Sequence, residues 1–421
     1  MQSFINPYFI NKSRIVIKIG SSLLVRDGEF NFTWLESLAS DIAELINSNI
    51  APEVVIVTSG AVAIGKESLK NYNTNKKLSI AEKQASAAIG QISLMSNYHQ
   101  IFAKAQLNVA QILLSATDCN LRKSYQNTCN TIKTLISSQF IPIINENDSV
   151  ATEEIKIGDN DRLAARVAQM IDADLLILFS DIDGLYSENP NNNPKANFIS
   201  VVEKINLRVE SMAQGSSSSV GTGGMVTKII AAKMATVNYC SVIITSGIEN
   251  NALSKLVKSR FNVENINADN ICLEAENSNN NAEEHKERSQ DSKKFTIFLA
   301  NKQKPLKSSR KISKSKKNWL SGLISAKGSL LINDCAVLAM KSGKNSLLPI
   351  GVTAVEGNFK SGEVVFIKNA EGKHLGNGIV NYDSDIVGDI IKKNSEEISE
   401  IVGFGKKTIL INAEYMVIFS K

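Results

Sequence analysis

The sequence is poor in the features that mark secreted, membrane and metal-binding proteins. Its 421 residues include only 5 cysteines, which are widely scattered and form no C-x-x-C pair. This argues against a disulfide framework or a zinc site and is typical of proteins in the reducing cytoplasm. No apolar run approaches the roughly 20 residues that span a bilayer, and the N-terminus lacks the pattern of a signal peptide. We therefore expect a cytoplasmic protein that does not enter a membrane.

Histidine is also scarce. The three histidines are His99, in a probable helix, His285, in a polar segment, and His374, beside a glycine turn. None of them lies in the polar motifs described below. Acid–base catalysis by histidine is therefore not expected.

The excess of positive charge is confined to one short segment. The net charge is +5, but residues 302–317 hold eight lysine or arginine side chains and no acidic one. The remaining residues carry 39 basic and 42 acidic side chains, a net charge of −3. A general affinity for nucleic acid is therefore not indicated, and we interpret the basic segment as a solvated linker.

The first 260 residues show the pattern of an α/β protein. The β-branched run 15–19 predicts a buried parallel strand, and residues 54–57 predict the next one. Between them, Thr33 and Glu36 are spaced as a capping box, at the start of a helix whose apolar side chains recur on one face. This strand–helix–strand unit, with further strands expected at 141–144, 175–179 and 242–244, predicts a mainly parallel sheet flanked by helices.

The composition changes after residue 262. Residues 274–294 are rich in Asn, Glu, Ser and Lys, and little in them can be buried. A brief apolar stretch at 295–300 suits a single strand. From Trp319 onward, short β-type runs such as 364–367 and 409–411 alternate with glycines. We therefore predict a catalytic domain at 1–262, a polar low-complexity linker at 263–317 and a small β-rich domain at 318–421.

Polar and glycine-rich residues follow four of the predicted strands. In an open α/β sheet, ligands bind beyond the carboxyl ends of the strands. One polar strand end means little, because turns need these residue types, but four together predict a shared cleft. The four segments are Lys18–Ser22, Thr58–Gly60, Asn145–Asp148 and Ser180–Gly184.

Two further segments suit the same cleft. Gly158–Asp161 precedes a helix, and an N-cap with favourable acidic residues is its simpler interpretation. Gly221–Lys228 contains three glycines, which would let backbone N–H groups approach phosphate oxygens; a flexible loop is the alternative. Residues 60–67 resemble a Walker A loop, but the last of them, Glu67, stands where Ser or Thr must ligate magnesium.

These residue types favour phosphoryl transfer to a carboxylate. Such catalysis depends on positioning and charge neutralisation, which lysines and anion-binding backbone can supply. A carboxylate acceptor is already ionised at neutral pH and needs no general base. Its repulsion from the phosphate would be relieved by ammonium groups such as those of Lys18 and Lys228.

The same motifs resemble the amino-acid kinase family, and within it the kinases that act on glutamate. The strings INENDSVATEEIKIGDND and GTGGMVTK carry this resemblance, together with their order and spacing. The region from about Trp319 resembles a PUA domain, through segments 327–331, 346–349 and 357–363. The resemblance implies the amino-acid kinase fold, a mainly parallel sheet flanked by helices, followed by a small β-rich PUA-like domain.

The resemblance also implies an activity. Members of this kind phosphorylate the γ-carboxylate of L-glutamate with ATP, giving γ-glutamyl phosphate, in the first step of proline biosynthesis. Magnesium would arrive with ATP, and no metal site built from the protein is expected. The resemblance further implies feedback inhibition by proline and a homo-oligomer.

Residue roles follow from the matching motifs. The resemblance assigns catalysis to Lys18, Asp161 and Lys228, and glutamate binding to Ser59, Asp148 and Asn160. It assigns nucleotide binding to Lys18, Ser180, Asp181, Thr222, Gly223, Gly224, Met225, Val226, Thr227 and Lys228. Two positions depart from the usual pattern: Ser180 stands where Thr is common, and Val226 stands where a hydroxyl residue is frequent.

Two other functions stay open. A member of the same fold could use a different acceptor, such as aspartate, N-acetylglutamate, carbamate or a nucleotide. Alternatively, the PUA-like domain and the basic segment could make this an RNA-binding protein with a vestigial kinase site. The presence of Lys18, Asp161 and Lys228 argues against a vestigial site, and the scarcity of aromatic residues in the PUA-like region argues against base stacking there.

Overall fold

The chain folds into two compact units, residues 1–304 and 305–421. The structure is a computed structural model. No helix in the part of the chain described here is long and apolar enough to cross a membrane. The described residues are 5–10, 12–26, 29–69, 78–115, 118–119, 121–150, 160–213, 224–259, 271–273, 293–300, 319–320, 326–340, 345–391, 393, 398 and 409–419.

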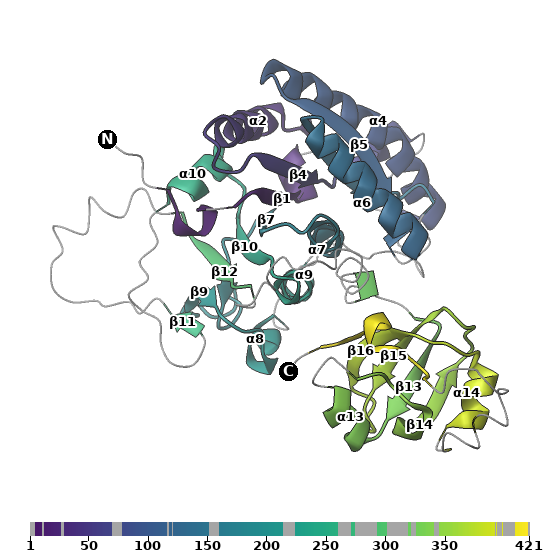
Figure 1. Cartoon of the computed structure of the whole chain (residues 1–421). Helices are drawn as coiled ribbons and strands as arrows, with labels where there is room; N and C mark the ends of the chain where they lie inside the picture. Colours follow the sequence, from purple (N-terminus) through teal and green to yellow (C-terminus); the bar gives the residue numbers. More distant parts are fainter. Residues whose placement is uncertain are drawn as a thin grey trace, which may run out of the picture. The chain divides into compact units, whose positions relative to one another are not determined.

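A parallel sheet forms the centre of the first unit, as the sequence predicts (Figure 1). The strands at its centre are apolar runs that are buried on both faces, whereas the edge strand Asn108–Leu114 is largely exposed or half-buried. The six neighbouring parallel strands are, in spatial order, β10 (Ser241–Ser246), β7 (Leu175–Ser180), β1 (Arg14–Ile19), β4 (Glu53–Val57), β6 (Phe140–Glu146) and β5 (Asn108–Leu114).

Four more strands extend the sheet beyond β10. The apolar run at 295–300 supplies β12 (Phe295–Phe298), which pairs antiparallel with β10. β12 also pairs with β9 (Phe198–Val202), which carries β11 (Ile271–Leu273) and β8 (Leu185–Tyr186). The first unit therefore extends past the predicted boundary at residue 262, because the side chains of β12 are buried in its sheet. Most of the predicted linker lies outside the described residues.

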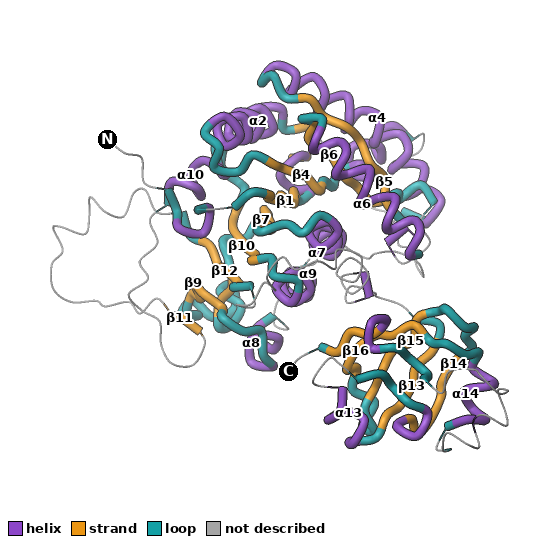
Figure 2. The backbone as a smooth tube through the Cα atoms, in the orientation of Figure 1, coloured by secondary structure: helices purple, strands orange, loops and turns teal. Residues whose placement is uncertain are grey.

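The two faces of the sheet are covered by different helices (Figure 2). Side chains alternate along a strand, so Ile15, Ile17 and Ile19 of β1 share one face. They join an apolar cluster with α2 (Phe32–Asn47), α4 (Ile80–Lys104) and α10 (Ala252–Lys258). The helices on the other face are α6 (Arg122–Ser137), α7 (Asn160–Met170) and α9 (Met225–Val237).

The start of α2 differs from the predicted capping box at Thr33 and Glu36. The N-cap lies two residues earlier than predicted, at Asn31, because its side chain accepts a hydrogen bond from the Trp34 backbone N–H (3.3 Å), and the helix begins at Phe32. Asn is a stronger N-cap than Thr. Glu36 instead pairs with Lys104 on α4 (2.9 Å). The predicted apolar face of α2 is confirmed by the burial of Leu35, Leu38, Ile42 and Leu45.

The second unit contains a five-stranded sheet with its own core. The spatial order of its strands is β14 (Val352–Gly357), β13 (Gly328–Ile332), β15 (Val364–Lys368), β16 (His374–Ile379) and β17 (Met416–Ile418). Two short helices, α13 (Asp334–Met340) and α14 (Ser384–Ile390), accompany the sheet. The predicted β-type run 409–411 contributes only a bridge between Ile411 and Leu347.

Candidate active site

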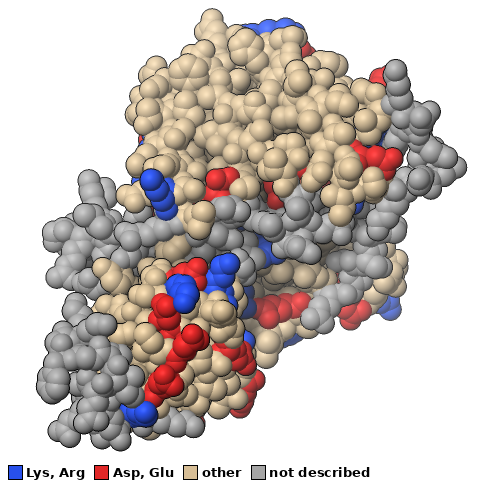
Figure 3. Space-filling view, turned by 90° about the vertical axis from the view of Figure 1, so that its right-hand side faces the viewer, with Lys and Arg blue, Asp and Glu red and all other residues tan. Residues whose placement is uncertain are grey.

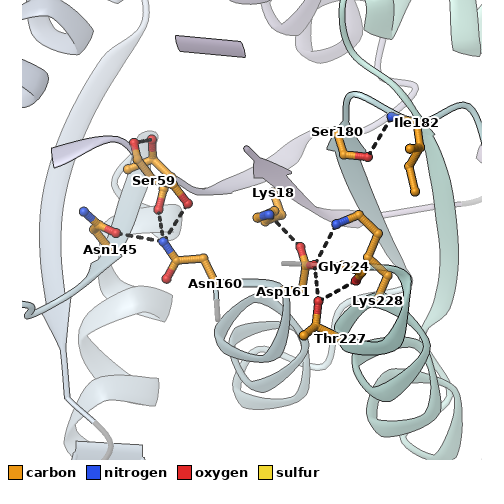
Figure 4. A network of polar contacts seen from close by, with 11 residues as sticks. Lys18, Ser59, Asn145, Asn160, Asp161, Ser180, Ile182, Gly224, Thr227 and Lys228 are labelled. Atoms are coloured by element: carbon orange, nitrogen blue, oxygen red, sulfur yellow. Dashed lines mark hydrogen bonds and ion pairs between the residues drawn. The ribbon is translucent and has the colours of Figure 1, made fainter. Parts of the chain in front are cut away.

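Two lysines and one aspartate meet in the buried part of the first unit (Figure 4). Lys18 Nζ lies 2.6 Å from Asp161 Oδ1, and Lys228 Nζ lies 2.9 Å from Asp161 Oδ2. The three side chains come from β1, α7 and α9, so residues more than 200 positions apart in sequence share one carboxylate. The structure thus brings together the three residues that the resemblance assigns to catalysis.

Local structure explains this meeting. Lys18 follows Ile17 on β1, so its side chain points to the opposite face from the isoleucines, the face on which α7 packs. Asp161 lies in the first turn of α7, where the helix dipole favours an acidic side chain. Lys228 lies in the first turn of α9, which packs against α7.

The ion pairs are almost completely buried. The exposed fractions of Lys18, Asp161 and Lys228 are 5%, 0% and 2%. Burial alone would raise the pKa of Asp161, but the charges and hydrogen bonds of the two lysines lower it to about 2. Asp161 is therefore ionised at neutral pH. One carboxylate between two ammonium groups leaves a net positive charge, which suits an anionic ligand.

The first turn of α9 also contributes a hydroxyl contact to Asp161. Gly224 is the N-cap of the helix, and its carbonyl oxygen lies 2.8 Å from the hydroxyl of Thr227. That hydroxyl also lies 3.1 Å from Asp161 Oδ2. Met225 is buried, and the apolar side chain of Val226 is exposed. Thr222 and Gly223 lie outside the described residues.

A second polar group surrounds Asn160, the residue before Asp161. The Asn160 side-chain amide donates to the Thr58 carbonyl oxygen (2.7 Å) and to Ser59 Oγ (2.8 Å). Its nitrogen also lies 3.1 Å from Asn145 Oδ1, at the end of β6. Two of the polar strand ends predicted from sequence, those after β4 and β6, therefore meet Asn160 of α7 here. Asp148 is half-buried in the turn that follows β6, and its role stays a prediction.

Sequence reasoning missed one member of this group, Gln91. It lies in the middle of α4, and its Oε1 accepts from Asn145 Nδ2 (2.9 Å). No local pattern singles out a glutamine inside a helix. Its position depends on Gly90, where an added Cβ would lie 1.9 Å from the carbonyl oxygen of Ala61. This close crossing of α4 and α3 (Ala61–Gly65) brings Gln91 to the end of β6.

The end of β7 lies beside the lysines. Its last residue, Ser180, is buried and stands two positions beyond Leu178, the register partner of Lys18. Ser180 Oγ accepts from the Ile182 backbone N–H (3.3 Å), while Asp181 is exposed. No cluster of three or more His, Cys, Asp or Glu side chains that could hold a metal occurs among the residues described.

Comparison with known proteins gives two family matches. The model of the amino acid kinase family matches residues 13–246, and the PUA domain model matches residues 328–402. A curated protein of Paramagnetospirillum magneticum, named glutamate 5-kinase, is 39% identical over 406 residues, which are 96% of this chain and 97% of that one. A protein of the same name from Brucella anthropi is 38% identical over 97% of this chain and 96% of its own.

Proposed function

The chain belongs to the amino acid kinase family, and on this premise we propose that it phosphorylates the γ-carboxylate of L-glutamate with ATP. The product would be γ-glutamyl phosphate, the first intermediate of proline biosynthesis. Relatives named glutamate 5-kinase match nearly the whole of both chains. The observation that carries the proposal is the buried arrangement of Lys18, Asp161 and Lys228, with its net positive charge.

The reaction needs charge neutralisation more than proton transfer. A γ-carboxylate oxygen attacks the terminal phosphorus of ATP, a new bond between this oxygen and phosphorus forms, and the bond to the departing ADP breaks. Because the carboxylate is already ionised, no base is needed. In this proposal Lys18 and Lys228 neutralise the charge of the transferring phosphoryl group, and Asp161 holds both ammonium groups in place.

The nucleotide would bind between the end of β7 and the start of α9. Ser180, Asp181 and residues 222–228 are its proposed contacts. The exposed carboxylate of Asp181 has the oxygen donors that magnesium prefers, so this end of the site fits a magnesium–ATP complex. Magnesium would supply further neutralisation of the phosphate charges. Ser59, Asp148 and Asn160 are the proposed contacts to glutamate.

The identity of the acceptor can be tested directly. Purified protein, ATP and magnesium are mixed with L-glutamate, and the acyl phosphate is trapped with hydroxylamine. We expect hydroxamate with L-glutamate and little with aspartate or N-acetylglutamate. Turnover of either of those acceptors without turnover of glutamate would instead identify a different member of the family.

A homo-oligomer is part of this proposal. The side of the first unit that carries α4, β5 and α6 shows few charged side chains, as the upper part of Figure 3 illustrates. Apolar side chains are exposed there: Ile92 is 76% exposed, and Ile89 and Leu113 are also exposed. Light scattering of the purified protein measures the assembly, and a monomer at micromolar concentration would contradict it.

Feedback inhibition and location complete the proposal. Proline shares the α-carboxylate of glutamate but has no γ-carboxylate to phosphorylate, so we expect it to compete with glutamate and not with ATP. Steady-state kinetics at varied concentrations of glutamate would measure this competition.

A cytoplasmic location is supported by free thiols at Cys119, Cys129, Cys240 and Cys335.

A further inference from the structure

The amide of Asn145 can have only one orientation. Its Oδ1 accepts a hydrogen bond from the backbone N–H of Glu146 (2.9 Å), and a backbone N–H can only donate. The Asn145 Nδ2 must therefore face Gln91, and it lies 2.9 Å from Gln91 Oε1. Since Gln91 uses its oxygen for this contact, its Nε2 is left as a donor that points away from Asn145.

The amide of Asn160 is fixed in the same way. The Thr58 carbonyl oxygen can only accept, so the group 2.7 Å from it must be the Asn160 nitrogen. Asn160 Oδ1 is then left as an acceptor. Both Gln91 Nε2 and Asn160 Oδ1 are buried, and neither has a hydrogen-bond partner in the structure as described. The Ser59 hydroxyl accepts from Asn160 and donates to no other described group.

A buried polar atom without a hydrogen-bond partner destabilises the folded protein. A ligand that pairs such atoms would remove this destabilisation. The group offers two donors, Gln91 Nε2 and the Ser59 hydroxyl, and one acceptor, Asn160 Oδ1. A carboxylate can only accept hydrogen bonds, and an ammonium group can only donate them. The two donors and the acceptor thus complement the α-carboxylate and the α-ammonium group of an amino acid.

We propose that Gln91 is a specificity-determining residue that, with Ser59, binds the α-carboxylate of the acceptor, while Asn160 Oδ1 binds its α-ammonium group. This inference rests on the proposed glutamate kinase activity and adds which group binds which end of the substrate. Asn145 is a positioning residue, because it fixes the orientation of the Gln91 amide.

The start of α7 supports this direction of binding (Figure 4). The side chains of two consecutive residues point to different partners there. Asn160 contacts Asn145, and Asp161 contacts Lys18 and Lys228. An acceptor whose α-carbon lies at these amides would extend its γ-carboxylate toward Lys18 and Lys228. The first turn of α7 thus sets the direction in which the acceptor would lie in the site.

A charge substitution tests this assignment. Gln91→Glu keeps an oxygen that can accept from Asn145 but replaces the donor with a negative charge. We expect the KM for L-glutamate to rise about tenfold or more, with the KM for ATP unchanged. The second acceptor is L-isoglutamine, which keeps the γ-carboxylate and the α-ammonium group but has an α-carboxamide. Because a carboxamide can donate to Glu, the preference for glutamate over isoglutamine should fall at least tenfold in the variant.

The control and the contrary results are equally specific. Gln100→Glu adds the same charge on α4, where Gln100 is exposed and bonds only to Ser96 within the described residues; it should leave both KM values unchanged. Equal effects of Gln91→Glu on the two acceptors, or no effect on either, would overturn the assignment. If Gln91→Glu does not fold, Gln91→Met removes the donor without adding charge and should also lower the preference. Absence of glutamate turnover in the unmodified enzyme would instead refute the proposed function.

Discussion

At the scale of single residues, Asp161 has two roles that both depend on its ionised carboxylate. It neutralises part of the charge of two buried ammonium groups, and it holds them beside each other. Its pKa is about 2 in the folded protein, below the ordinary value of 3.8. A lowered folded-state pKa contributes stability above pH 3.8, and this contribution is lost as the pH falls toward 2.

Asp161→Asn should therefore lose activity and stability together. At pH 7 we expect a loss of about 3–5 kcal/mol in the free energy of unfolding, because two buried ammonium groups lose their counterion. Urea unfolding should show a difference from the unmodified protein that is constant from pH 7 to about 4.5 and shrinks below that pH. Glu210→Gln, which breaks the exposed ion pair with Lys233, should cost less than about 1 kcal/mol. A pH-independent difference for Asp161→Asn would contradict the account.

The sequence predicted part of this site for clear physical reasons. Lys18 lies near the end of a buried β-branched run, and Asp161 lies in the first turn of a helix, so both could be placed near the ends of elements. Gln91 could not be found, because it lies 54 residues from Asn145 and inside a long helix. Its role depends on packing between helices, which local sequence does not record.

At the scale of elements, the crossing of α3 and α4 holds the proposed acceptor side of the site. Gly65 and Gly90 let the two helix backbones touch: an added Cβ at either glycine would lie 1.9 Å from a backbone oxygen of the other helix. α3 starts directly after Ser59 and Gly60, and Gln91 follows Gly90. The position of one helix against the other thus sets the distance between two proposed acceptor contacts.

Gly90→Ala should separate these helices. We expect a loss of about 3 kcal/mol or more in the free energy of unfolding, because backbone atoms cannot move aside as a side chain can. The KM for glutamate should rise more than the KM for ATP. Gly388→Ala is the matched control: it lies in α14 with no atom within 4 Å of an added Cβ, and it should be neutral or slightly stabilising. Equal stability of the two variants in chemical unfolding would refute this packing argument.

The sequence pattern did not predict two other features of the elements, the pairing of one strand and the start of one helix. The apolar stretch at 295–300 could be recognised as a strand, but not its partners β10 and β9, because pairing depends on the whole sheet. The predicted start of α2 is two residues too late, because Asn31 and not Thr33 is the N-cap.

At the scale of the whole molecule, each of the two units has buried apolar side chains of its own among the described residues. One apolar cluster contains residues between Phe9 and Ile297, and the other contains residues between Leu330 and Met416. All the described residues of the candidate active site lie in the first unit. Residues 318–421 hold 11 basic and 11 acidic side chains, so this region has no net charge that would favour a strong electrostatic affinity for RNA.

Thermal unfolding should therefore occur in two steps. Differential scanning calorimetry of the full chain should show two transitions, because each unit has an apolar core of its own. Added ATP and magnesium should raise the Tm of only one of them, the transition of the first unit. A single transition whose calorimetric and van't Hoff enthalpies agree would contradict the independence of the units.

The most direct test of the central claim is the rate of acyl phosphate formation from ATP and L-glutamate by Lys228→Ala, trapped with hydroxylamine. If Lys228 neutralises the transferring phosphoryl group, kcat should fall by about a hundredfold or more, as for loss of a transition-state contact. Lys233→Ala, which removes an exposed lysine from the same helix, should retain the full rate. A folded Lys228→Ala enzyme with unchanged kcat would show that the buried lysines do not carry the reaction.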